Sequence, residues 1–383
     1  MQEMIDRKIT SLVEKRLNQY PAVAFVGPRQ SGKTTLAQSL KGEYFDLENE
    51  ADKVTLDVNW DKLVSGSRLI ILDEAQEWPE VFKRLRGVID KDRKRNGRFL
   101  LLASVSPALM QHVSESLAGR MGLLELTPFM WSELPSQKHD QLWLRGGYPD
   151  GGILQPDRYP QWQQQYLELL AMRDLPHWGL PAKPQMTLRL IKMLAAVHGQ
   201  TLNASQLGQS LDIVYKTVKS YLEYLEGAFL IRQLQPFHAN LKKRLIKSPK
   251  IYWRDSGLLH ALLNVTDTQE LFHQPWVGAS WEGFVIEQII GALKLKDSFF
   301  TPYFLRTGDQ YEIDLVLDFG KQRWAIEIKL TSSPTVSDMQ RLNKVADMID
   351  ASRRVMISRT SQNTDNGNVI SCNLDWFIRS LED

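Results

Sequence analysis

A glycine-rich segment near the amino terminus has the residue types and spacing of a phosphate-binding loop. The apolar run 23–26 leads directly into Gly27, Pro28, Arg29, Gln30, Ser31, Gly32, Lys33, Thr34 and Thr35. Such glycines let backbone N–H groups close around phosphate oxygens at the start of a helix, whose dipole favours anions. In this pattern Lys33 reaches the β- and γ-phosphates, and the hydroxyl of Thr34 is a Mg²⁺ ligand. Residues 27–35 therefore predict a binding site for ATP and Mg²⁺.

Two acidic residues follow a second apolar run. Asp73 and Glu74 come directly after residues 69–72. A buried strand that ends in Asp73 would place a carboxylate beside the phosphate loop to hold Mg²⁺, and Glu74 would polarise the attacking water. Ser104 ends the apolar run 99–103 and is predicted to direct its hydroxyl at the γ-phosphate or its water. A serine that merely begins a loop remains the alternative. Together these residues predict ATP hydrolysis.

Arg120 ends the segment SLAGR, immediately before a further apolar run. An arginine in this place can extend from one subunit into the ATP of its neighbour and stabilise the transition state in trans. It therefore predicts a homo-oligomer. The alternative is a solvated arginine at a helix end.

A second set of charged residues lies near the carboxyl terminus. Residues 312–317 and 324–330 both alternate apolar and polar side chains, which is typical of strands, and Gly320 with Lys321 suits a two-residue hairpin turn. That turn places Asp314 opposite Glu327 and Glu312 opposite Lys329 on one face. Ile313 and its alternate neighbours form the other, buried face.

Facing carboxylates repel each other unless a cation lies between them. Asp314, Glu327 and Lys329 match the metal-and-lysine arrangement of PD-(D/E)xK nucleases, in which the carboxylates hold Mg²⁺ and the lysine acts on the water. In the helical segment 281–293, Glu282 falls within the apolar arc and is predicted as a further metal ligand, whereas Glu287 falls on the opposite side.

The middle of the chain has the pattern of a winged helix-turn-helix. Residues 203–211 and 215–228 are predicted helices joined by a short turn, and residues 229–234 and 251–253 are predicted strands of the wing. The basic side chains of the second helix and of the wing loop would contact DNA phosphates: Lys216, Lys219, Lys242, Lys243, Arg244, Lys247 and Lys250. The alternative is a module that only packs between ATPase domains.

These segments define an α/β protein with three predicted domains. Residues 1–150 alternate strands and helices, as in a P-loop NTPase of AAA+ type with a parallel sheet. Residues 151–265 form the helical winged helix-turn-helix region, and residues 266–383 form an α/β domain of restriction-endonuclease type. The strands expected in the first domain are residues 22–26, 43–47, 69–72, 99–103 and 122–126.

Composition limits the classes of function. The chain of 383 residues has a formal net charge of +2, so any nucleic-acid-binding surface must be local. The single cysteine, Cys372, excludes an intramolecular disulfide framework and a cysteine-rich zinc site, and it is typical of a reducing compartment. The apolar runs are strand-sized and no basic start precedes one. We therefore expect a cytoplasmic protein without a signal peptide or a membrane partner.

Several of these segments resemble one protein family. GPRQSGKTTL, LDEAQEWP, SLAGR with LELTPF, and LRGGYP look like the bacterial AAA ATPases that carry a C-terminal DUF4143 domain, in the AAA+ superfamily near the archaeal-type ATPases. IKSPKIYWRDSGLL, SWEGFVIEQ and the pair EID and EIK match as well, so the resemblance covers nearly the whole chain. It implies an AAA ATPase fused to a winged helix and a restriction-endonuclease-like domain. The family usually has Thr-Gly-Ser where this chain has Leu102, Ala103 and Ser104.

Two functions fit these predictions. The first is an ATP-hydrolysing enzyme that acts on DNA, with a Mg²⁺-dependent nuclease-like C-terminal domain. The second is a nucleotide-switched oligomeric scaffold or regulator whose C-terminal fold is catalytically inert. An intact set of Asp314, Glu327 and Lys329 favours the first function, because a purely structural module has no need of it.

Overall fold

The computed structural model describes residues 5–105, 117–237, 248–307 and 311–382. The chain divides into two compact units: Met1–Phe129 with Gly227–Leu230, and Met130–Glu226 with Ile231–Asp383. Within the described ranges, no helix has both the length and the apolar character that crossing a membrane requires.

The first unit is built on a parallel sheet of five strands in the order β2-β3-β4-β1-β5. Its central strands are buried at every position, because a parallel sheet with both faces covered needs successive apolar residues. Each strand begins and ends within one residue of its predicted range, so the predicted parallel sheet is confirmed. The strands are β1 Ala22–Val26, β2 Gly42–Asp46, β3 Leu69–Asp73, β4 Phe99–Ala103 and β5 Met121–Glu125.

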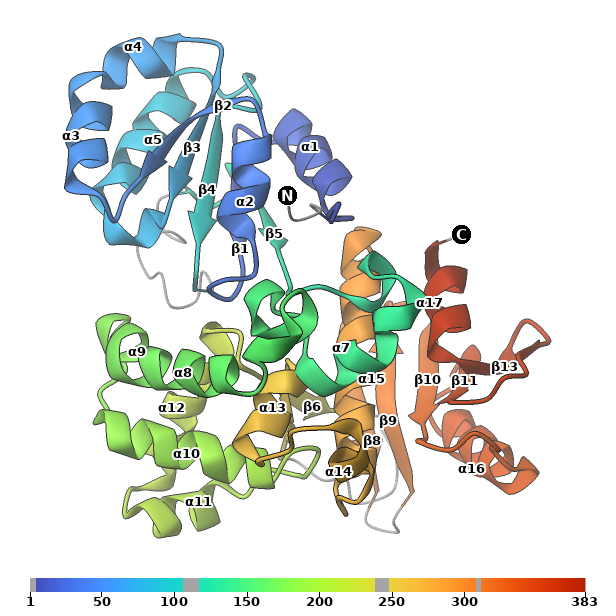
Figure 1. Cartoon of the computed structure of the whole chain (residues 1–383). Helices are drawn as coiled ribbons and strands as arrows, with labels where there is room; N and C mark the ends of the chain where they lie inside the picture. The colour runs from blue at the N-terminus through green and yellow to red at the C-terminus, as the bar shows by residue number, and fades with distance from the viewer. Residues whose placement is uncertain (1–4, 106–116, 238–247, 308–310, 383) are drawn as a thin grey trace. The chain divides into compact units, whose positions relative to one another are not determined.

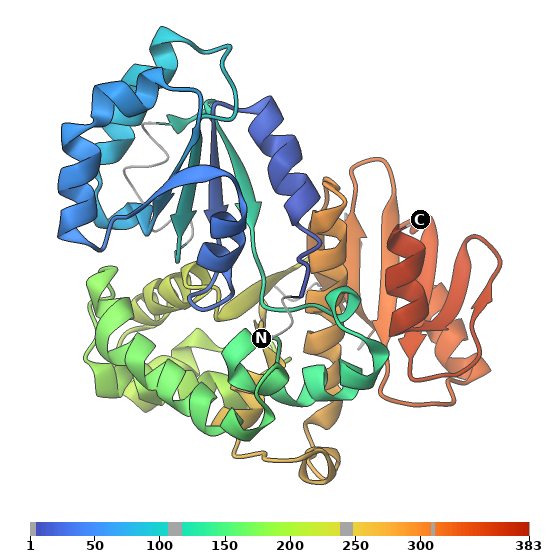
Figure 2. The same ribbon diagram turned by 45° about the horizontal axis from the view of Figure 1, so that its top comes forward.

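Helices lie on both sides of this sheet (Figure 1, Figure 2). They are α1 Thr10–Gln19, α2 Lys33–Ser39, α3 Glu50–Val58, α4 Trp60–Ser65 and α5 Glu80–Lys91, with the short turn η1 Ala75–Glu77. Helix α5 buries one stripe at helical spacing, formed by Val81, Phe82, Leu85 and Ile89. Because β1, β3 and β4 are parallel, the loops that follow them meet at the same edge of the sheet.

The second unit begins with a helical region. Its helices are α7 His139–Arg145, α8 Gln161–Leu169, α9 Leu175–His177, α10 Pro184–Ala196, α11 Ala204–Leu211, α12 Tyr215–Gly227, α13 Ser256–Leu262 and α14 Thr268–Phe272. Short 3₁₀- or π-helical segments between and before them are η2 Trp131–Glu133, η3 Ser136–Lys138, η4 Pro149–Ile153, η5 Pro156–Arg158 and η6 Leu170–Asp174. The side chain of Asn203 caps α11 by accepting from the N–H of Gln206 at 3.1 Å. Asp212, with φ 55°, makes the turn that leads to α12.

An eight-stranded sheet occupies the rest of this unit, in the order β12-β13-β11-β10-β9-β8-β6-β7. The strands are β6 Ile231–Pro236, β7 Lys250–Trp253, β8 Thr301–Arg306, β9 Glu312–Asp318, β10 Arg323–Ile328, β11 Arg353–Ser358, β12 Thr364–Asp365 and β13 Val369–Asn373. Strands β6 and β7 pair antiparallel, as the wing prediction requires. However, β6 also pairs in parallel with β8 through Gln235–Tyr303 and Pro236–Phe304, so this hairpin belongs to the larger sheet.

Both faces of that sheet are buried under helices. Leu342 and Val345 of α16 Val336–Asp347 pack with Val316 and Ala325 of the hairpin. Phe377 of α17 Leu374–Glu382 lies 6.5 Å from the ring of Trp324, whose side chain points to the other face. The remaining helix, α15 Val277–Leu295, is buried along most of its length. The expectation of a single buried face was therefore wrong.

The β9–β10 hairpin has the predicted register. Pairing runs from Asp318–Arg323 to Leu315–Ile326, and Gly320 makes the turn with φ 83°. Toward β8, however, β9 has one extra residue between the pairs Val316–Tyr303 and Ile313–Leu305. This β-bulge breaks the alternation, so Ile313 joins the cluster under α16 together with Val316. Asp314 lies within the bulge.

Candidate functional site

The glycine-rich segment forms a tight loop between β1 and α2. Gly27 has φ 156°, and a Cβ on it would lie 2.2 Å from the carbonyl oxygen of Leu126, so only glycine fits there. Gly32 has φ 96°, in the left-handed region, and immediately precedes α2. The loop therefore directs the N-terminal N–H groups of α2 into the turn that it encloses.

Lys33 directs its ammonium group back into this loop. Its Nζ donates to the carbonyl oxygens of Gly27 and Pro28, each at 2.9 Å, and to the hydroxyl of Ser104 at 3.2 Å. Burial lowers the pKa of Lys33 to about 8, although the carboxylates of Glu74 and Asp73 oppose that effect. The ammonium thus lies inside the loop, where the oxygens of a bound phosphate group would replace its present acceptors.

Asp73, the last residue of β3, forms hydrogen bonds with a residue at the start of α2 and with a residue of β2. Its buried carboxylate accepts from the hydroxyl of Thr34 at 2.6 Å and from the hydroxyl of Tyr44 at 2.7 Å, both through Oδ2. Burial and the bond to Asp73 raise the pKa of Tyr44 above its ordinary value, so Tyr44 stays a donor. Thr34 and Asp73 therefore contact each other as the sequence predicts. Tyr44 is a further residue of this site that the sequence did not indicate.

Glu74 has a constrained backbone and a defined side-chain position. Its φ of 47° lies in the left-handed region, which is uncommon for a residue with a side chain. The hydroxyl of Ser104 donates to Oε1 of Glu74 at 2.9 Å, and the amide of Gln76 donates to Oε2 at 2.5 Å. Since Ser104 also accepts from Lys33, its hydroxyl links the lysine to Glu74. The structure thus brings Lys33, Thr34, Asp73, Glu74 and Ser104 to one site.

A second unpredicted residue supports the loop from outside. Arg7 donates to the carbonyl oxygen of Ser31 at 2.9 Å and to that of Thr127 at 2.7 Å. Its guanidinium also lies 4.8 Å from the centre of the Phe129 ring. Nothing in the sequence around Arg7 indicated this contact, because the residues that it joins are far apart along the chain.

These residues fit ATP and Mg²⁺. Ser31 is fully buried, and its hydroxyl has no hydrogen-bond partner among the described residues. Lys33 and the loop amides would hold the phosphates. Thr34 and Asp73 are oxygen ligands of the kind that Mg²⁺ prefers, and the bound ion would neutralise charge on the phosphates. The other loop residues are peripheral: Arg29 pairs with Glu48 at 2.8 Å, and Gln30 and Thr35 are exposed.

Arg120 lies away from this group within the chain. It makes a two-bond ion pair with Asp90 of α5, from Nε to Oδ1 at 2.8 Å and from Nη2 to Oδ2 at 3.1 Å. That pairing lowers the pKa of Asp90 to about 2. A role in a neighbouring subunit would require Arg120 to leave this partner, and the role stays a prediction.

The carboxyl-terminal hairpin opens where the second site was predicted. The backbone pairing ends at Leu315–Ile326. Beyond it, Oδ2 of Asp314 accepts from the backbone N–H of Ile328 at 2.8 Å, so a side-chain oxygen takes the place of the next backbone acceptor. Lys329 Nζ lies 3.3 Å from Oε1 of Glu327 and 3.8 Å from Oδ1 of Asp338. Oε2 of Glu327 is buried and has no hydrogen-bond partner in the part of the chain that is described.

Lys250 contradicts its predicted role as a DNA contact. It is the first residue of β7 and only 3% exposed, because alternation along this strand directs it inward together with Tyr252. Its Nζ lies 3.0 Å from Oε1 of Glu282 and 2.6 Å from Oε1 of Glu312. The hydroxyl of Tyr252 donates to the same oxygen of Glu282. A lysine that opens an otherwise apolar strand was the signal that sequence reasoning missed.

The charges of this cluster explain its pKa values. Burial, with Glu282 and Glu327 nearby, raises the pKa of Asp314 well above its ordinary value. Burial also raises the pKa of Glu327 to about 7, although Lys329 opposes this. For Lys250 burial acts to lower the pKa, but the carboxylates around it raise the pKa above that of a free lysine. The lysine is therefore charged at neutral pH.

The predicted metal ligands do not form a three-carboxylate site. Among the described residues, no three His, Cys, Asp or Glu side chains converge in a way that could hold a metal ion. Glu282 faces inward as predicted, but its carboxylate is bound by Lys250. Glu287, predicted to face the opposite way, is largely withdrawn from solvent as well and pairs with Arg232 and Arg254 at 2.9 and 3.1 Å. The residues present do not fit a divalent ion held by Glu282, Asp314 and Glu327.

Three family models match successive parts of the chain. They are an AAA domain over residues 19–135, the domain of unknown function DUF8612 over residues 136–269, and the domain of unknown function DUF4143 over residues 277–375. The uncharacterized protein Rv2008c of Mycobacterium tuberculosis is 39% identical over 341 residues, which cover 88% of this chain and 76% of that protein. The uncharacterized protein Mb2031c of Mycobacterium bovis matches with the same values.

This chain belongs to the family of AAA ATPases with a C-terminal DUF4143 domain. Its residues 19–135 are accordingly an AAA-type ATPase domain. Among solved structures, the Walker-type ATPase PABY2304 of Pyrococcus abyssi has a TM-score of 0.47 and 14% identity, covering 68% of this chain and 96% of that chain. The models of the middle and C-terminal segments name no function.

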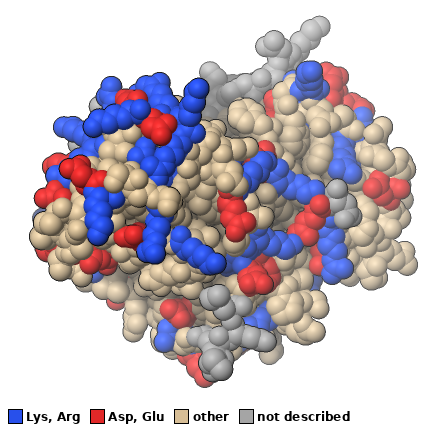
Figure 3. All heavy atoms as spheres, turned by 90° about the horizontal axis from the view of Figure 1, so that it is seen from above, with Lys and Arg blue, Asp and Glu red and all other residues tan. Residues whose placement is uncertain are grey.

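In this member of the AAA–DUF4143 family, the predicted DNA contacts differ in their positions. Lys216 and Lys219 are exposed at the start of α12, beside Tyr215, and Lys219 lies 5.6 Å from the centre of the Tyr215 ring. Lys242, Lys243, Arg244 and Lys247 fall outside the described residues. Basic and acidic side chains are interspersed on the face shown in Figure 3, in keeping with the nearly balanced net charge.

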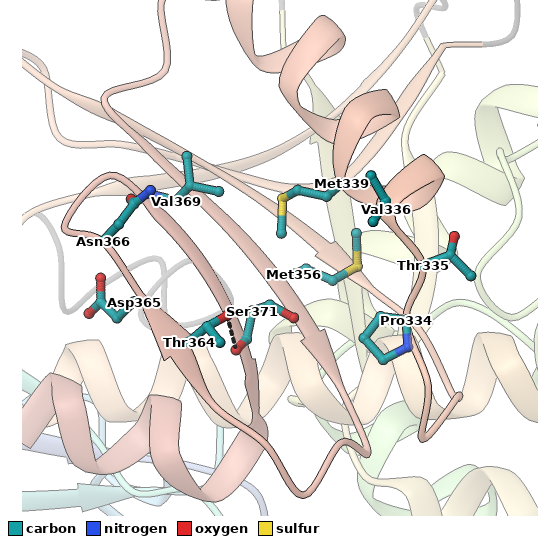
Figure 4. A pocket seen from close by; sticks show the side chains of 10 residues that line it. All are labelled: Pro334, Thr335, Val336, Met339, Met356, Thr364, Asp365, Asn366, Val369 and Ser371. Carbon is teal, nitrogen blue, oxygen red and sulfur yellow. Dashed lines mark hydrogen bonds between the residues drawn. The ribbon is translucent and has the colours of Figure 1, made fainter.

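A pocket of about 370 Å³ lies on the C-terminal sheet, between the start of α16 and strands β11 to β13 (Figure 4). Met339 and Met356 line it together with Thr335, Asp365 and Asn366. Met356 is paired with Glu327 on the neighbouring strand, so the pocket adjoins the face that carries Glu327. None of the site residues above lines it.

Proposed function

We propose that this protein binds and hydrolyses ATP with Mg²⁺ and that it uses the nucleotide cycle to act on DNA. The observation that carries the first part is the convergence of Lys33, Thr34 with Asp73, and Ser104 with Glu74 at the loop after β1. Lys33 and the loop amides bind the β- and γ-phosphates, and Thr34 and Asp73 hold the ion. Glu74 orients the attacking water.

The hydrogen bonds suggest how a nucleotide would alter this site. Lys33 donates to Ser104, and Ser104 donates to Glu74, so all three side chains satisfy one another without ATP. A γ-phosphate that takes over the ammonium of Lys33 leaves the hydroxyl of Ser104 without that donor. Ser104 then becomes available to the phosphate, and Glu74 to a water molecule.

The test is ATP turnover with Mg²⁺ in three variants. We expect Lys33→Ala to lose ATP affinity, and Glu74→Gln to keep affinity but to hydrolyse ATP at least about 100-fold more slowly, as loss of a general base does. Glu80→Gln, an exposed glutamate in the first turn of α5, is the matched control and should leave turnover unchanged. Wild-type turnover in Glu74→Gln would refute the assignment.

The action on DNA is supported by the pair α11 and α12. Two short helices joined by a tight turn present the exposed residues Tyr215, Lys216 and Lys219 at the start of the second helix. In helix-turn-helix proteins this end of the second helix enters the major groove, and lysines there neutralise phosphates. An aromatic ring next to two lysines also suits stacking on an unpaired base.

DNA binding is measured by fluorescence anisotropy across a range of salt concentrations. The double variant Lys216→Ala and Lys219→Ala should bind all DNA sequences more weakly, with the slope of log affinity against log salt smaller by about 2. Lys192→Ala removes an exposed lysine from α10 and serves as the control. Stimulation of ATP hydrolysis by DNA in the wild type, lost in the double variant, would link the two activities. An unchanged slope would remove the helix pair from the proposal.

A second candidate is a nucleotide-switched oligomeric regulator with a catalytically inert C-terminal fold. The ion pairs from Lys250 to Glu282 and Glu312 favour it over Mg²⁺-dependent cleavage, because they use the carboxylates that a metal would need. The bulge at Asp314 and the pair of Glu327 with Lys329 favour a nuclease. Mg²⁺-dependent cleavage of branched or single-stranded DNA that disappears in Glu327→Ala decides for the nuclease.

The oligomer with Arg120 in trans is tested by mixing two inactive variants. Lys33→Ala lacks a nucleotide site but supplies Arg120, and Arg120→Ala has the nucleotide site but lacks the arginine. Recovery of ATP hydrolysis on mixing requires that the two chains assemble and share a site. If mixing restores no activity and Arg120→Ala alone is as active as the wild type, the role in trans is refuted. Arg120 then serves only as the ion-pair partner of Asp90.

A further inference from the structure

The ammonium group of Lys250 occupies a particular place in the C-terminal domain. It comes from β7, whereas Glu282 lies on α15 and Glu312 on β9, so three separate elements meet at one buried cation. The distances of 3.0 and 2.6 Å to the two carboxylates are those of charge-assisted hydrogen bonds. Its Nζ also lies over the ring of Phe304, 5.5 Å from the ring centre. These contacts fix the lysine in one position.

The same carboxylates would be needed by a divalent ion. Mg²⁺ and Mn²⁺ bind carboxylate oxygens at about 2.0–2.2 Å, so an ion bridging Glu282 and Glu312 would have to lie where Nζ now lies. In the remaining pair, one oxygen of Asp314 accepts from the backbone N–H of Ile328 and Oε1 of Glu327 pairs with Lys329, which leaves Oε2 of Glu327 without a partner in the described part of the chain. An ion at this pair would also lie near an ammonium group, which repels it.

We propose that Lys250 is the built-in cation of this carboxylate cluster and that the cluster binds no divalent metal while Lys250 is present. The lysine supplies the positive charge that allows Glu282, Glu312 and Asp314 to lie close together. The inference is independent of ATP hydrolysis and of DNA binding. It limits what this cluster can do, because a reaction that needs a metal ion held by these carboxylates is excluded.

The experiment measures Mn²⁺ binding to the full chain at neutral pH, without nucleotide, by electron paramagnetic resonance and by thermal unfolding. Wild type is expected to show no Mn²⁺ site that depends on Glu282, and no rise in Tm with Mn²⁺. Lys250→Ala removes the charge and leaves space. We expect a lower Tm without metal, about one bound Mn²⁺ per chain, and a recovery of Tm by several degrees. Lys250→Ala with Glu282→Gln should lose that ion.

The matched control is Lys344→Ala, which removes an exposed lysine of α16 that contacts Tyr311. It should gain no Mn²⁺ site, so that a general change of charge is separated from a change in the cluster. Any weak binding at Thr34 and Asp73 is recognised because Glu282→Gln does not alter it.

Two results would overturn the proposal. One is a stoichiometric Mn²⁺ site in wild type that disappears in Glu282→Gln, which needs only folded wild-type and Glu282→Gln chains and so holds even if Lys250→Ala does not fold. The other is a folded Lys250→Ala chain that loses Tm but gains neither Mn²⁺ nor stability from it. In that case the lysine is only a structural ion pair.

Discussion

The pH dependence of nucleotide affinity follows from the surroundings of Lys33. Burial lowers the pKa of its ammonium from 10.5 to about 8 in the nucleotide-free protein. The phosphates of a bound nucleotide place negative charge beside the ammonium and raise its pKa again, so binding takes up a proton wherever the free protein has lost it. The affinity for nucleotide therefore has its full value well below pH 8 and falls as the pH rises through 8.

The magnitude comes from the charged fraction of Lys33. With a pKa of about 8, about nine tenths of the lysine is charged at pH 7 and about one tenth at pH 9. The affinity for ADP should then fall about tenfold between these pH values, or about 1.4 kcal/mol. Calorimetric titration with ADP in EDTA excludes any metal contribution. The terminal phosphate of ADP keeps its charge over this range, since phosphate esters lose their last proton at a pKa of about 6.

The control is Lys33→Arg, because a guanidinium stays charged at both pH values. Its ADP affinity, although weaker, should not depend on pH. Repeating the titration at pH 9 in two buffers of different ionisation enthalpy should show uptake of nearly one proton by the wild type alone. Equal wild-type affinity at pH 7 and pH 9, without proton uptake, would refute the reasoning.

Three further predictions concern residues that support the two sites. Arg7→Met should raise the Kd for ADP several-fold in the same titration, because the phosphate loop loses a fixed contact; an unchanged Kd would exclude Arg7 as a positioning residue. Glu287→Gln should lower the free energy of unfolding in urea by about 3 kcal/mol, since it leaves two largely buried arginines without their carboxylate. Glu50→Gln, which breaks an exposed pair, should change it very little. Tyr44→Phe should lower the free energy of unfolding in urea by about 1 kcal/mol, because the hydrogen bond to Asp73 is lost. Equal stability of the variant and the wild type would contradict that contact.

The convergence of the phosphate-loop residues with Asp73 and Glu74 was predictable because its information is local. The loop 27–34 and the acidic end of β3 each lie within a few residues of an apolar strand, and parallel strands bring such ends together. The register of β9 and β10 was predictable for a similar reason, since a two-residue turn leaves one way to pair the strands.

The rest of the sites depends on contacts between distant segments. The predicted face of Ile313 was wrong because a β-bulge toward β8 shifts the alternation of side chains. The sequence of β9 itself gives no sign of the extra residue. Lys250 was placed with the basic loop before it, although its neighbours in space come from α15 and β9. The inward position of Glu287 was missed because helical periodicity assumes one solvated side, and residues 280–293 of α15 have none.

The double pairing of β6 decides how the protein can be divided. A fragment starting at residue 266 omits β6 and β7, so the backbone of β8 is left with a free edge that pairs readily with other chains. The same cut removes the counter-charge from Glu282 and Glu312. A fragment that begins at Ile231 retains both strands. We expect this fragment to fold and to remain monomeric.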